Sequence, residues 1–359
     1  MPFTLSSPDC ETRHTFPAAA SRERRLRLAT PAPLRALACA VVALPQLALG
    51  AAVSANTIRI ATWNLEWLVS PQAFKPLKLD CTPEGTAVHG DVRQIPCDVA
   101  STLERSSRDF AVLARYAREL DADVVALQET DGADAARLVF PDYAFCFTGR
   151  QHVQNTGFAV RHGVPFRCGP DDRELSLGDT LRRGKELTLF PGEPQEIRLL
   201  SVHLKSGCSS KPLTATDKAC HDLARQVPIL EAWIDAQAHA GKRFAVLGDF
   251  NRDLLSEESR GLTLGRETSL WAELADGAPP EAALRNAAAG AVFRNCVPGQ
   301  GYRGYIDNIV LSRALAADAI PGSFARLTYR PADARHARLS DHCPVSVRLN
   351  VREKTTPAG

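Results

Sequence analysis

The stretch FAVLGDFNRD, residues 244–253, runs from a candidate strand directly into polar residues. Its first four residues are continuously apolar, which is typical of a strand buried on both faces. Gly248 allows the backbone to turn where that strand ends. Asp249 and Asn251 are two residues apart, so in an extended chain both side chains point the same way. An Asp/Asn turn would explain this stretch alone, but the pattern equally predicts a ligand site at the carboxyl end of a strand.

Similar polar residues occur at or near the ends of the other candidate strands. They are Asn64, Glu129, His203 with Lys205, Asp307, and Asp341 with His342. Each has a simple structural explanation by itself, as a turn former, a helix cap or a core histidine. Asp307 is harder to explain in this way, because an acid inside an apolar run needs a partner when it is buried. Six such positions together indicate one functional site.

The residue types at these positions fit the hydrolysis of a phosphoester. Oxygen donors with few cysteines favour Mg²⁺, or alternatively Mn²⁺ or Ca²⁺, over zinc. A small set of protein ligands leaves most of a Mg²⁺ coordination shell to water and substrate phosphate. Two histidines can transfer protons near neutral pH, and a carboxylate behind one of them would fix its tautomer.

The N-terminal segment 1–55 differs from the rest of the 359-residue chain. Arginines at positions 22, 24, 25, 27 and 35 precede an apolar run over 36–49, and small residues follow at 51–55. This order predicts a secretory signal peptide that is removed, leaving a secreted or periplasmic protein. The apolar run is short and contains Pro45, which makes a membrane-spanning helix unfavourable.

Removal of residues 1–55 changes the formal charge. The whole chain carries 43 basic and 41 acidic residues, whereas the remainder would carry 37 and 38. A net charge of −1 lacks the overall basic character of a protein that binds nucleic acid without sequence preference, although a local basic groove stays compatible with it. With 45% hydrophobic and 23% charged residues, the composition is that of a globular domain. We expect one domain over 56–352, a monomer, and a disordered tail over 353–359.

Eight of the ten cysteines lie beyond the predicted signal peptide. An even number in an exported chain indicates disulfides. No two of these cysteines have the spacing of a zinc knuckle, so metal binding by cysteine is disfavoured. Eight cysteines allow 105 pairings, and proximity in the sequence favours Cys81–Cys97, Cys146–Cys168, Cys208–Cys220 and Cys296–Cys343.

Strand-like and helix-like segments alternate along the chain. The expected strands are 57–63, 123–127, 157–161, 186–190, 197–203, 244–248, 306–312 and 345–351. Amphipathic helices are expected over 108–120 and 222–237, the second with a kink at Pro228. Residues 69–108 and 206–221 are expected to form long loops.

The motifs ATWNLEW, LQET, VHLKS, GDFN, YIDN and SDHCPV, in this order, resemble those of the endonuclease/exonuclease/phosphatase superfamily. This superfamily includes pancreatic-type deoxyribonucleases, AP endonucleases, neutral sphingomyelinases and inositol-polyphosphate 5-phosphatases. The resemblance covers about 57–350. It implies an α/β fold, a four-layer sandwich of two packed mixed sheets flanked by helices, with the site in the cleft between the motif loops.

The resemblance also implies roles for individual residues. Glu129 would be the principal metal ligand, with Asn64 beside it and Asp341 as a possible second ligand. Asp249 and Asn251 would orient or activate the attacking water and bind a phosphate oxygen. The general acid or base would be His342, held by Asp307, with His203 as its complement across the phosphate.

The deoxyribonuclease, sphingomyelinase and 5-phosphatase branches have a histidine at the position that resembles His203, whereas the AP-endonuclease branch lacks one. His203 therefore disfavours an AP endonuclease. Arg183 and Lys205 are candidate substrate contacts, although a solvated basic turn would also explain Arg183. The deoxyribonuclease branch pairs its first histidine with a glutamate, where this chain offers Gln154 or Asn155 instead. What orients His203 is therefore open.

Three functions are compatible with these observations. The first is a secreted, divalent-metal-dependent phosphodiesterase, and specifically a nuclease with nucleic acid as its partner. The second is a sphingomyelinase-like lipid phosphodiesterase or a small-molecule phosphatase. The sequence shows no aromatic hairpin that would enter a membrane, and aromatic residues make up 6% of the chain. The third is a binding module without catalysis, which the complete set of polar residues disfavours.

Overall fold

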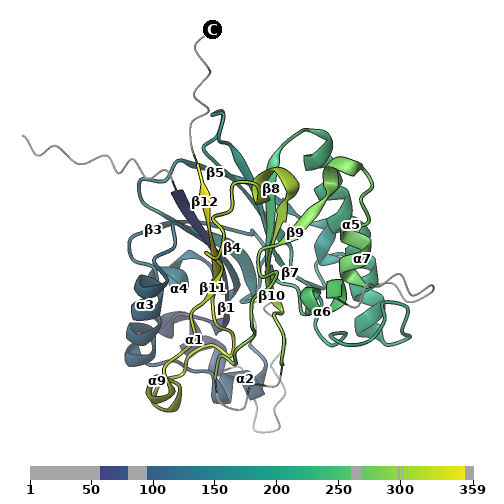
Figure 1. Cartoon of the computed structure of the whole chain (residues 1–359). Helices are drawn as coiled ribbons and strands as arrows, with labels where there is room; N and C mark the ends of the chain where they lie inside the picture. The colour runs from purple at the N-terminus through teal and green to yellow at the C-terminus, as the bar shows by residue number, and fades with distance from the viewer. Residues whose placement is uncertain (1–56, 80–94, 260–268, 298–299, 301, 352–359) are drawn as a thin grey trace, which may run out of the picture. The chain divides into compact units, whose positions relative to one another are not determined.

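The computed structural model describes residues 57–351 apart from 80–94, 260–268, 298–299 and 301 (Figure 1). The predicted signal peptide and the predicted tail lie outside the described residues. The first sheet has the strand order β11-β12-β1-β2-β4-β3 and the second has the order β5-β6-β7-β8-β10-β9. Each sheet contains one pair of parallel neighbouring strands, β1 and β2 in the first sheet and β7 and β8 in the second. The other neighbouring strands are antiparallel.

The strands of the first sheet are β1 (Thr57–Leu68), β2 (Val124–Thr130), β3 (Tyr143–Phe147), β4 (Asn155–Arg161), β11 (Ala325–Arg326) and β12 (Val345–Asn350). Those of the second sheet are β5 (Phe166–Asp172), β6 (Gly184–Leu189), β7 (Ile197–His203), β8 (Arg243–Asp249), β9 (Leu284–Asn286) and β10 (Asp307–Ser312). The described α-helices are α1 (Pro71–Leu79), α2 (Cys97–Thr102), α3 (Ser107–Leu120), α4 (Ala133–Arg137), α5 (Lys218–His239), α6 (Leu254–Ser259), α7 (Leu270–Leu274), α8 (Arg313–Ala316) and α9 (Pro331–His336).

Three apolar layers hold the fold together. Apolar side chains from both sheets, including Ile60 and Leu247, form one cluster between the sheets. On the outer face of the first sheet, α3 buries residues such as Leu113 against β1 and β2. On the outer face of the second sheet, α5 buries residues such as Leu230 against β8. The predicted four-layer α/β sandwich is therefore confirmed.

Two predictions about helices need correction. The segment 69–108, expected to be loop, contains α1 and α2. The apolar face of α1 packs through Phe74 onto Ile95 and Val153, so local burial stabilises a helix that has Pro76 inside it. The second amphipathic helix is longer than expected and continues through Pro228 as α5.

The two parallel strand pairs bring the predicted polar residues to one edge of each sheet. In the first sheet Asn64 on β1 is in register with Gln128 on β2, directly before Glu129. In the second sheet Asp249 on β8 is in register with His203 on β7 and with Asp307 on β10. Carboxyl ends of parallel neighbours meet at the same edge, which explains why motifs far apart in the sequence come together.

Gly248 serves close strand packing rather than the turn predicted from the sequence. It lies inside β8 with a φ of 153°. A Cβ at this position would lie 1.9 Å from the carbonyl oxygen of Val202 on β7. The glycine therefore permits the approach of β7 and β8 next to the polar cluster.

Replacing Gly248 with alanine is expected to lower the free energy of unfolding by roughly 1–3 kcal/mol or more, because the added methyl meets a backbone oxygen that cannot rotate away. Urea unfolding followed by circular dichroism would measure the loss. Gly149→Ala is the matched control, since a Cβ there meets only the Asp171 carboxylate at 3.7 Å. Equal stabilities of the two variants would contradict this account of Gly248.

Three disulfides fall within the described residues, and all match the predicted pairs. Cys146–Cys168 links β3 to β5 and so joins the two sheets, and Cys208–Cys220 links the segment after β7 to α5. Cys296–Cys343 links the segment before β10 to the residue that follows His342. Cys81 of the fourth predicted pair lies outside the described residues. No helix in the described ranges is long and apolar enough to cross a membrane.

Candidate active site

Asp249 lies at the centre of the predicted polar residues and is 1% exposed. Its Oδ2 accepts a hydrogen bond from Asn64 Nδ2 at 3.1 Å. The same oxygen lies 3.4 Å from His203 Nε2 and 3.8 Å from His342 Nε2. One buried carboxylate thus contacts residues from both sheets, and both imidazoles lie near the same oxygen.

The environment of Asp249 brings its pKa close to neutrality, the range suited to a general base. Burial raises the pKa of Asp249 to about 7, opposed by His342 and reinforced by the Asp307 carboxylate. The backbone N–H of Asn251 donates to Asp249 Oδ1 at 2.8 Å. Asn251 has a φ of 54°, which bends the chain back so that its Nδ2 donates to the Leu204 carbonyl at 3.1 Å. Positive φ is uncommon outside glycine and is least unfavourable for asparagine and aspartate.

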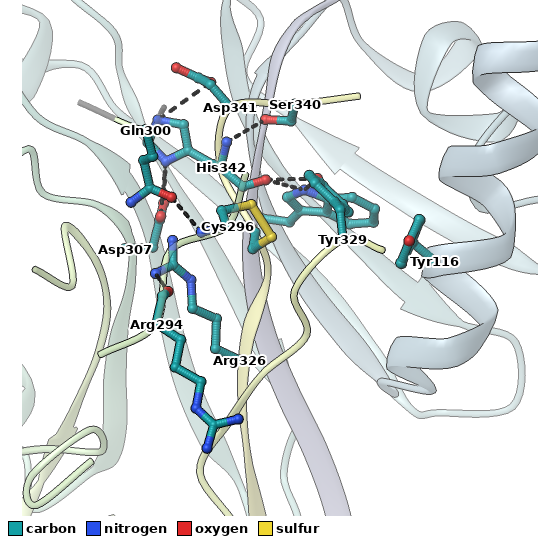
Figure 2. Close-up of a disulfide and its surroundings, with 12 residues drawn as sticks. Tyr116, Arg294, Cys296, Gln300, Asp307, Arg326, Tyr329, Ser340, Asp341 and His342 are labelled. Atoms are coloured by element: carbon teal, nitrogen blue, oxygen red, sulfur yellow. Dashed lines mark hydrogen bonds and ion pairs between the residues drawn. A yellow bond between two sulfur atoms is a disulfide. The ribbon is translucent and has the colours of Figure 1, made fainter. Parts of the chain in front are cut away.

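His342 is bound to the predicted partner, Asp307 (Figure 2). Its Nδ1 lies 2.8 Å and 3.0 Å from the two Asp307 oxygens, which leaves Nε2 directed toward Asp249. Burial disfavours the imidazolium, but the carboxylates of Asp307 and Asp249 outweigh it and hold the pKa of His342 well above its usual range. The surroundings of His342 therefore favour its charged form.

The backbone of His342 is fixed as firmly as its ring. Its carbonyl oxygen accepts hydrogen bonds from the Tyr329 hydroxyl at 2.7 Å and from Trp63 Nε1 at 3.3 Å. Its N–H donates to Ser340 Oγ at 3.0 Å. Figure 2 shows these bonds beside the Cys296–Cys343 disulfide. The imidazole thus projects from a loop that is held by hydrogen bonds and by a covalent link.

His203 has the opposite electrostatic character. It is 5% exposed, and burial together with the Arg182 guanidinium holds the pKa of His203 well below its usual range. Its Nδ1 has no hydrogen-bond partner among the described residues. The site therefore pairs a neutral imidazole, His203, with a charged one, His342.

Neither residue considered as a partner of His203 has that role in the structure. Gln154 Nε2 donates instead to Glu129 Oε2 at 2.7 Å. Asn155 accepts from the Thr148 hydroxyl at 2.8 Å. The imidazole of His203 is oriented by its packing and by its contact with Asp249, so the sequence departs here from the deoxyribonuclease pattern.

A group of carboxylates forms the other half of the site. Glu129 Oε1 accepts from Asn64 Nδ2 at 3.1 Å, and Glu129 Oε2 accepts from the Trp67 N–H at 3.2 Å. Asp341 contributes a side chain that is 57% exposed, while its backbone N–H donates to Glu66 Oε2 at 3.1 Å. Partial desolvation raises the pKa of Asp341, and the Glu129 carboxylate contributes to the rise.

Glu66 was not predicted from the sequence. Burial raises the pKa of Glu66 to about 7, with Asp341 adding to the rise and Arg105 opposing it. Its position two residues after Asn64 is the signal that could have identified it. Its backbone, with a φ of 45°, is not extended, so the alternation of a strand does not predict where the side chain points.

Two sets of side chains could hold a divalent cation. Asp249, Asp307 and His342 offer ligand atoms that all lie within 4.8 Å of one another. However, Nδ1 of this histidine already binds Asp307, and its charged ring would repel a cation. Glu66, Glu129 and Asp341 are the better fit, because they are oxygen donors whose mutual repulsion a divalent cation would relieve.

The predicted basic residues occupy different positions. Arg183 forms a two-point ion pair with Asp179, at 2.7 Å for both Nε and one terminal nitrogen, and lies 3.3 Å from Asp171. Its guanidinium is therefore held by carboxylates. Lys205 Nζ donates to the Ser206 carbonyl at 2.8 Å. It is the neighbouring Arg182 whose charge acts on Glu129, Asp249 and His203.

Comparison with known proteins identifies the class to which this fold and site belong. The chain belongs to the Endonuclease/Exonuclease/phosphatase family, whose model matches residues 61–342. This family consists of phosphoester hydrolases that generally use divalent metal ions. The family predicted from the motifs is therefore confirmed.

Among solved structures, the chain is similar to zebrafish (D. rerio) TDP2 complexed with single-strand DNA product, with 17% identity and a TM-score of 0.50 over 82% of this chain and 99% of that one. It is also similar to the 3'-5' exonuclease NExo from Neisseria meningitidis, with 17% identity and a TM-score of 0.48 over 82% of this chain and 100% of that one. A search of curated proteins found no match. These likenesses concern the fold alone.

Proposed function

We propose that this protein is an exported phosphodiesterase that requires a divalent cation and cleaves nucleic acid. The observation that carries the proposal is the position of Asp249 between a neutral and a charged imidazole, with its Oδ2 at 3.4 Å from His203 Nε2 and 3.8 Å from His342 Nε2. Hydrolysis requires one group that accepts a proton and another that donates one. This arrangement supplies both in one buried cluster.

The proposed reaction assigns each proton to a stated atom. Asp249 accepts the proton of the attacking water, which Asn251 helps to orient, as the new P–O bond forms. His342 donates its Nε2 proton to the leaving oxygen as the old P–O bond breaks, while Asp307 stabilises the charged ring. His203 donates a hydrogen bond through Nε2, to Asp249 before the reaction and to a phosphate oxygen during it.

A divalent cation, Mg²⁺ in the first instance, would be held by Glu129, Glu66 and Asp341 with Asn64 beside them, and when bound it would stabilise negative charge on the phosphate. The raised pKa values of Glu66 and Asp341, to which neighbouring carboxylates contribute, support this placement. The contribution of the protein is to hold these carboxylates in place, and Arg105 does so by donating to the carbonyl oxygens of Glu66 at 2.7 Å and Leu339 at 3.0 Å.

We further propose Arg182 in place of Arg183 as the residue that binds the scissile phosphate. Arg182 donates to the Leu204 carbonyl at 2.8 Å, and its Nε has no partner among the described residues. A half-buried arginine whose guanidinium keeps a free donor is suited to an anionic ligand. Arg183, in contrast, would first have to leave Asp179.

A panel of substrates tests the proposed function. The protein without its first 55 residues is incubated with Mg²⁺ and plasmid DNA, RNA, sphingomyelin, a nitrophenyl phosphodiester or a phosphomonoester. We expect cleavage of nucleic acid and of the nitrophenyl diester, and loss of both with EDTA. Hydrolysis of sphingomyelin or of the monoester alone would refute a nuclease and favour the lipid phosphodiesterase or the phosphatase.

Export and disulfide formation are tested by mass spectrometry. We expect protein recovered from outside the cytoplasm to begin near Asn56 and to contain four disulfides, because eight cysteines follow the predicted signal peptide. The mass before and after reduction gives the number of disulfides, and the N-terminal peptide gives the cleavage site. Eight free thiols, or an intact segment 1–55, would refute the prediction.

A further inference from the structure

Asp307 fixes the position of the His342 imidazole but not its plane. Both oxygens of Asp307 contact Nδ1, at 2.8 Å and 3.0 Å, and a ring that is held at one atom can still tilt about that atom. In the proposed reaction Nε2 of the same ring delivers a proton to the leaving oxygen. Because misplacement of a reacting group by about 1 Å can cost on the order of 10²-fold in rate, a side chain that limits this tilt affects the reaction directly.

Tyr302 lies against the imidazole of His342. The two ring centroids are 5.4 Å apart, at an interplanar angle of 35°, which is within the range of favourable contacts between aromatic rings. The hydroxyl of Tyr302 donates to the Asp341 carbonyl at 2.9 Å, at the peptide group that precedes the histidine. Tyr302 therefore restrains both the ring of His342 and the main chain that carries it.

The side chain of Tyr302 is held in turn by its own neighbours. Arg326 donates to the Tyr302 hydroxyl at 3.2 Å, and its Cζ lies 4.6 Å from the ring centroid of Phe293 and 5.6 Å from that of Tyr305. The rings of Phe293 and Tyr302 meet edge-on, with their centroids 6.4 Å apart. Contacts between a guanidinium and aromatic rings are favourable, so this cluster holds Tyr302 in one orientation against His342.

The segment that carries Tyr302 is also joined covalently to the loop of His342. Cys296 precedes Tyr302 in this segment and is bonded to Cys343, which follows His342 directly (Figure 2). The side chain of Gln300 connects the disulfide to the tyrosine, because its Oε1 accepts from the Cys296 N–H at 2.5 Å and its Nε2 donates to the Tyr302 carbonyl at 2.9 Å. The positions of Tyr302 and His342 are therefore linked by a covalent bond as well as by packing.

We propose that Tyr302 is a positioning residue, which acts through His342 by holding the imidazole in the plane from which Nε2 protonates the leaving oxygen. This inference rests on the proposed function and deepens it, because it gives a residue outside the predicted site a part in the proton-transfer step. Tyr302 transfers no proton itself, since its hydroxyl stays bonded to the Asp341 carbonyl. Loss of Tyr302 should therefore matter most for a substrate whose leaving oxygen needs a proton.

The test compares two substrates that differ only in the leaving group, the nitrophenyl and phenyl esters of thymidine 5′-phosphate, with Mg²⁺ present. Nitrophenolate leaves readily without a proton, whereas phenolate leaves slowly unless it is protonated. Tyr302→Leu should lower kcat on the phenyl ester by about 10-fold or more, with a smaller loss on the nitrophenyl ester and little change in KM, since the proton is transferred only in the transition state. Tyr302→Phe keeps the ring and should retain most of the activity on both esters.

A second tyrosine provides the matched control. Tyr143 on β3 also packs edge-on against an aromatic ring, that of Phe140 at a centroid distance of 5.3 Å, and its hydroxyl also donates to a carbonyl, that of Ala122 at 2.6 Å. Tyr143→Leu should therefore lower stability, but it should leave unchanged the ratio of kcat on the nitrophenyl ester to kcat on the phenyl ester, measured per folded molecule. An unchanged ratio in Tyr302→Leu as well would overturn the proposal.

Variants of His342 separate this inference from the proposed function. Because both residues act on one step, Tyr302→Leu should change the ratio no further when it is added to His342→Ala, and a full further change would refute the positioning role. If His342→Ala shifts the ratio and Tyr302→Leu alone does not, the positioning role is wrong and the proposed reaction stands. If the unmodified protein hydrolyses neither ester, the proposed function is wrong and the role of Tyr302 with it.

Discussion

Replacing His342 with alanine is expected to lower kcat by about 10²–10⁴-fold, the usual contribution of a general acid or base. The reason is that, in the proposed reaction, Nε2 of this buried imidazole supplies the proton for the leaving oxygen. His203→Ala should also lower kcat, since it removes the neutral imidazole beside Asp249. Steady-state rates on the nitrophenyl diester, divided by the folded fraction from circular dichroism, give the comparison.

The pH dependence shows whether His342 acts in its charged form. The carboxylate of Asp307 helps to raise the pKa of His342, so Asp307→Asn should lower that pKa. An acid that must be protonated loses activity as the pH rises through its pKa. The alkaline limb of the rate profile should therefore move to lower pH in Asp307→Asn. The acidic limb should reflect the need for an ionised Asp249, whose pKa is about 7, although both limbs belong to the cluster as a whole.

A surface histidine provides the control for these variants. His162 is exposed, so His162→Ala should leave kcat and both limbs unchanged. If His203→Ala and His342→Ala both turn over like the unmodified protein, the assignment of proton transfer to the histidines is wrong.

Replacing Glu129 with glutamine is expected to reduce Mg²⁺-dependent hydrolysis by on the order of 10²-fold or more, because a charged ligand of the cation is worth several kcal/mol at the transition state. Glutamine has nearly the same size and shape as glutamate. Asn64 Nδ2 and the Trp67 N–H donate to different oxygens of Glu129, so one of these hydrogen bonds would also weaken. The measurement is kcat against Mg²⁺ concentration, and the concentration for half-maximal rate should rise.

Thermal unfolding tests the same assignment without catalysis. A cation that binds only the folded protein raises the melting temperature in proportion to its binding free energy. Addition of Mg²⁺ should therefore stabilise the unmodified protein more than Glu129→Gln. Glu174→Gln, on an exposed side chain, should respond like the unmodified protein. Undiminished turnover of Glu129→Gln at low Mg²⁺ would refute the role of Glu129 as a ligand.

The sequence predicted the central strands because the signal for each of them, a run of apolar residues, lies within the strand itself. The run that became β8 is apolar on both faces, and burial between helix and sheet requires that composition. The edge strand β5 (Phe166–Asp172) was not predicted, since most of its side chains are exposed or half-buried and no apolar alternation marks it. Likewise, α1 depends on packing onto residues distant in the sequence, which periodicity does not reveal.

The candidate site was predictable where a side chain follows directly from a strand end, and less so elsewhere. Asp249 and His203 meet because β7 and β8 are parallel neighbours. Arg182 and Arg183 are adjacent, so their side chains point in different directions. An error of one residue in the sequence-based assignment therefore exchanges the arginine that contacts substrate with the one that does not. Glu66 depends on left-handed backbone angles where β1 departs from regular pairing, and a glutamate gives no sequence signal for such angles.

The disulfide next to His342 has a consequence for when the protein could become active. Cys343 follows the histidine directly, and its bond to Cys296 closes the loop that carries it. Thiols stay reduced in a cytoplasm and pair after export. Under the proposed export and nuclease activity, a newly made chain would lack this disulfide beside His342 while it shares a compartment with its own cell's nucleic acids. In that proposal, formation of the disulfide after export would complete the loop of His342 only where those nucleic acids are absent.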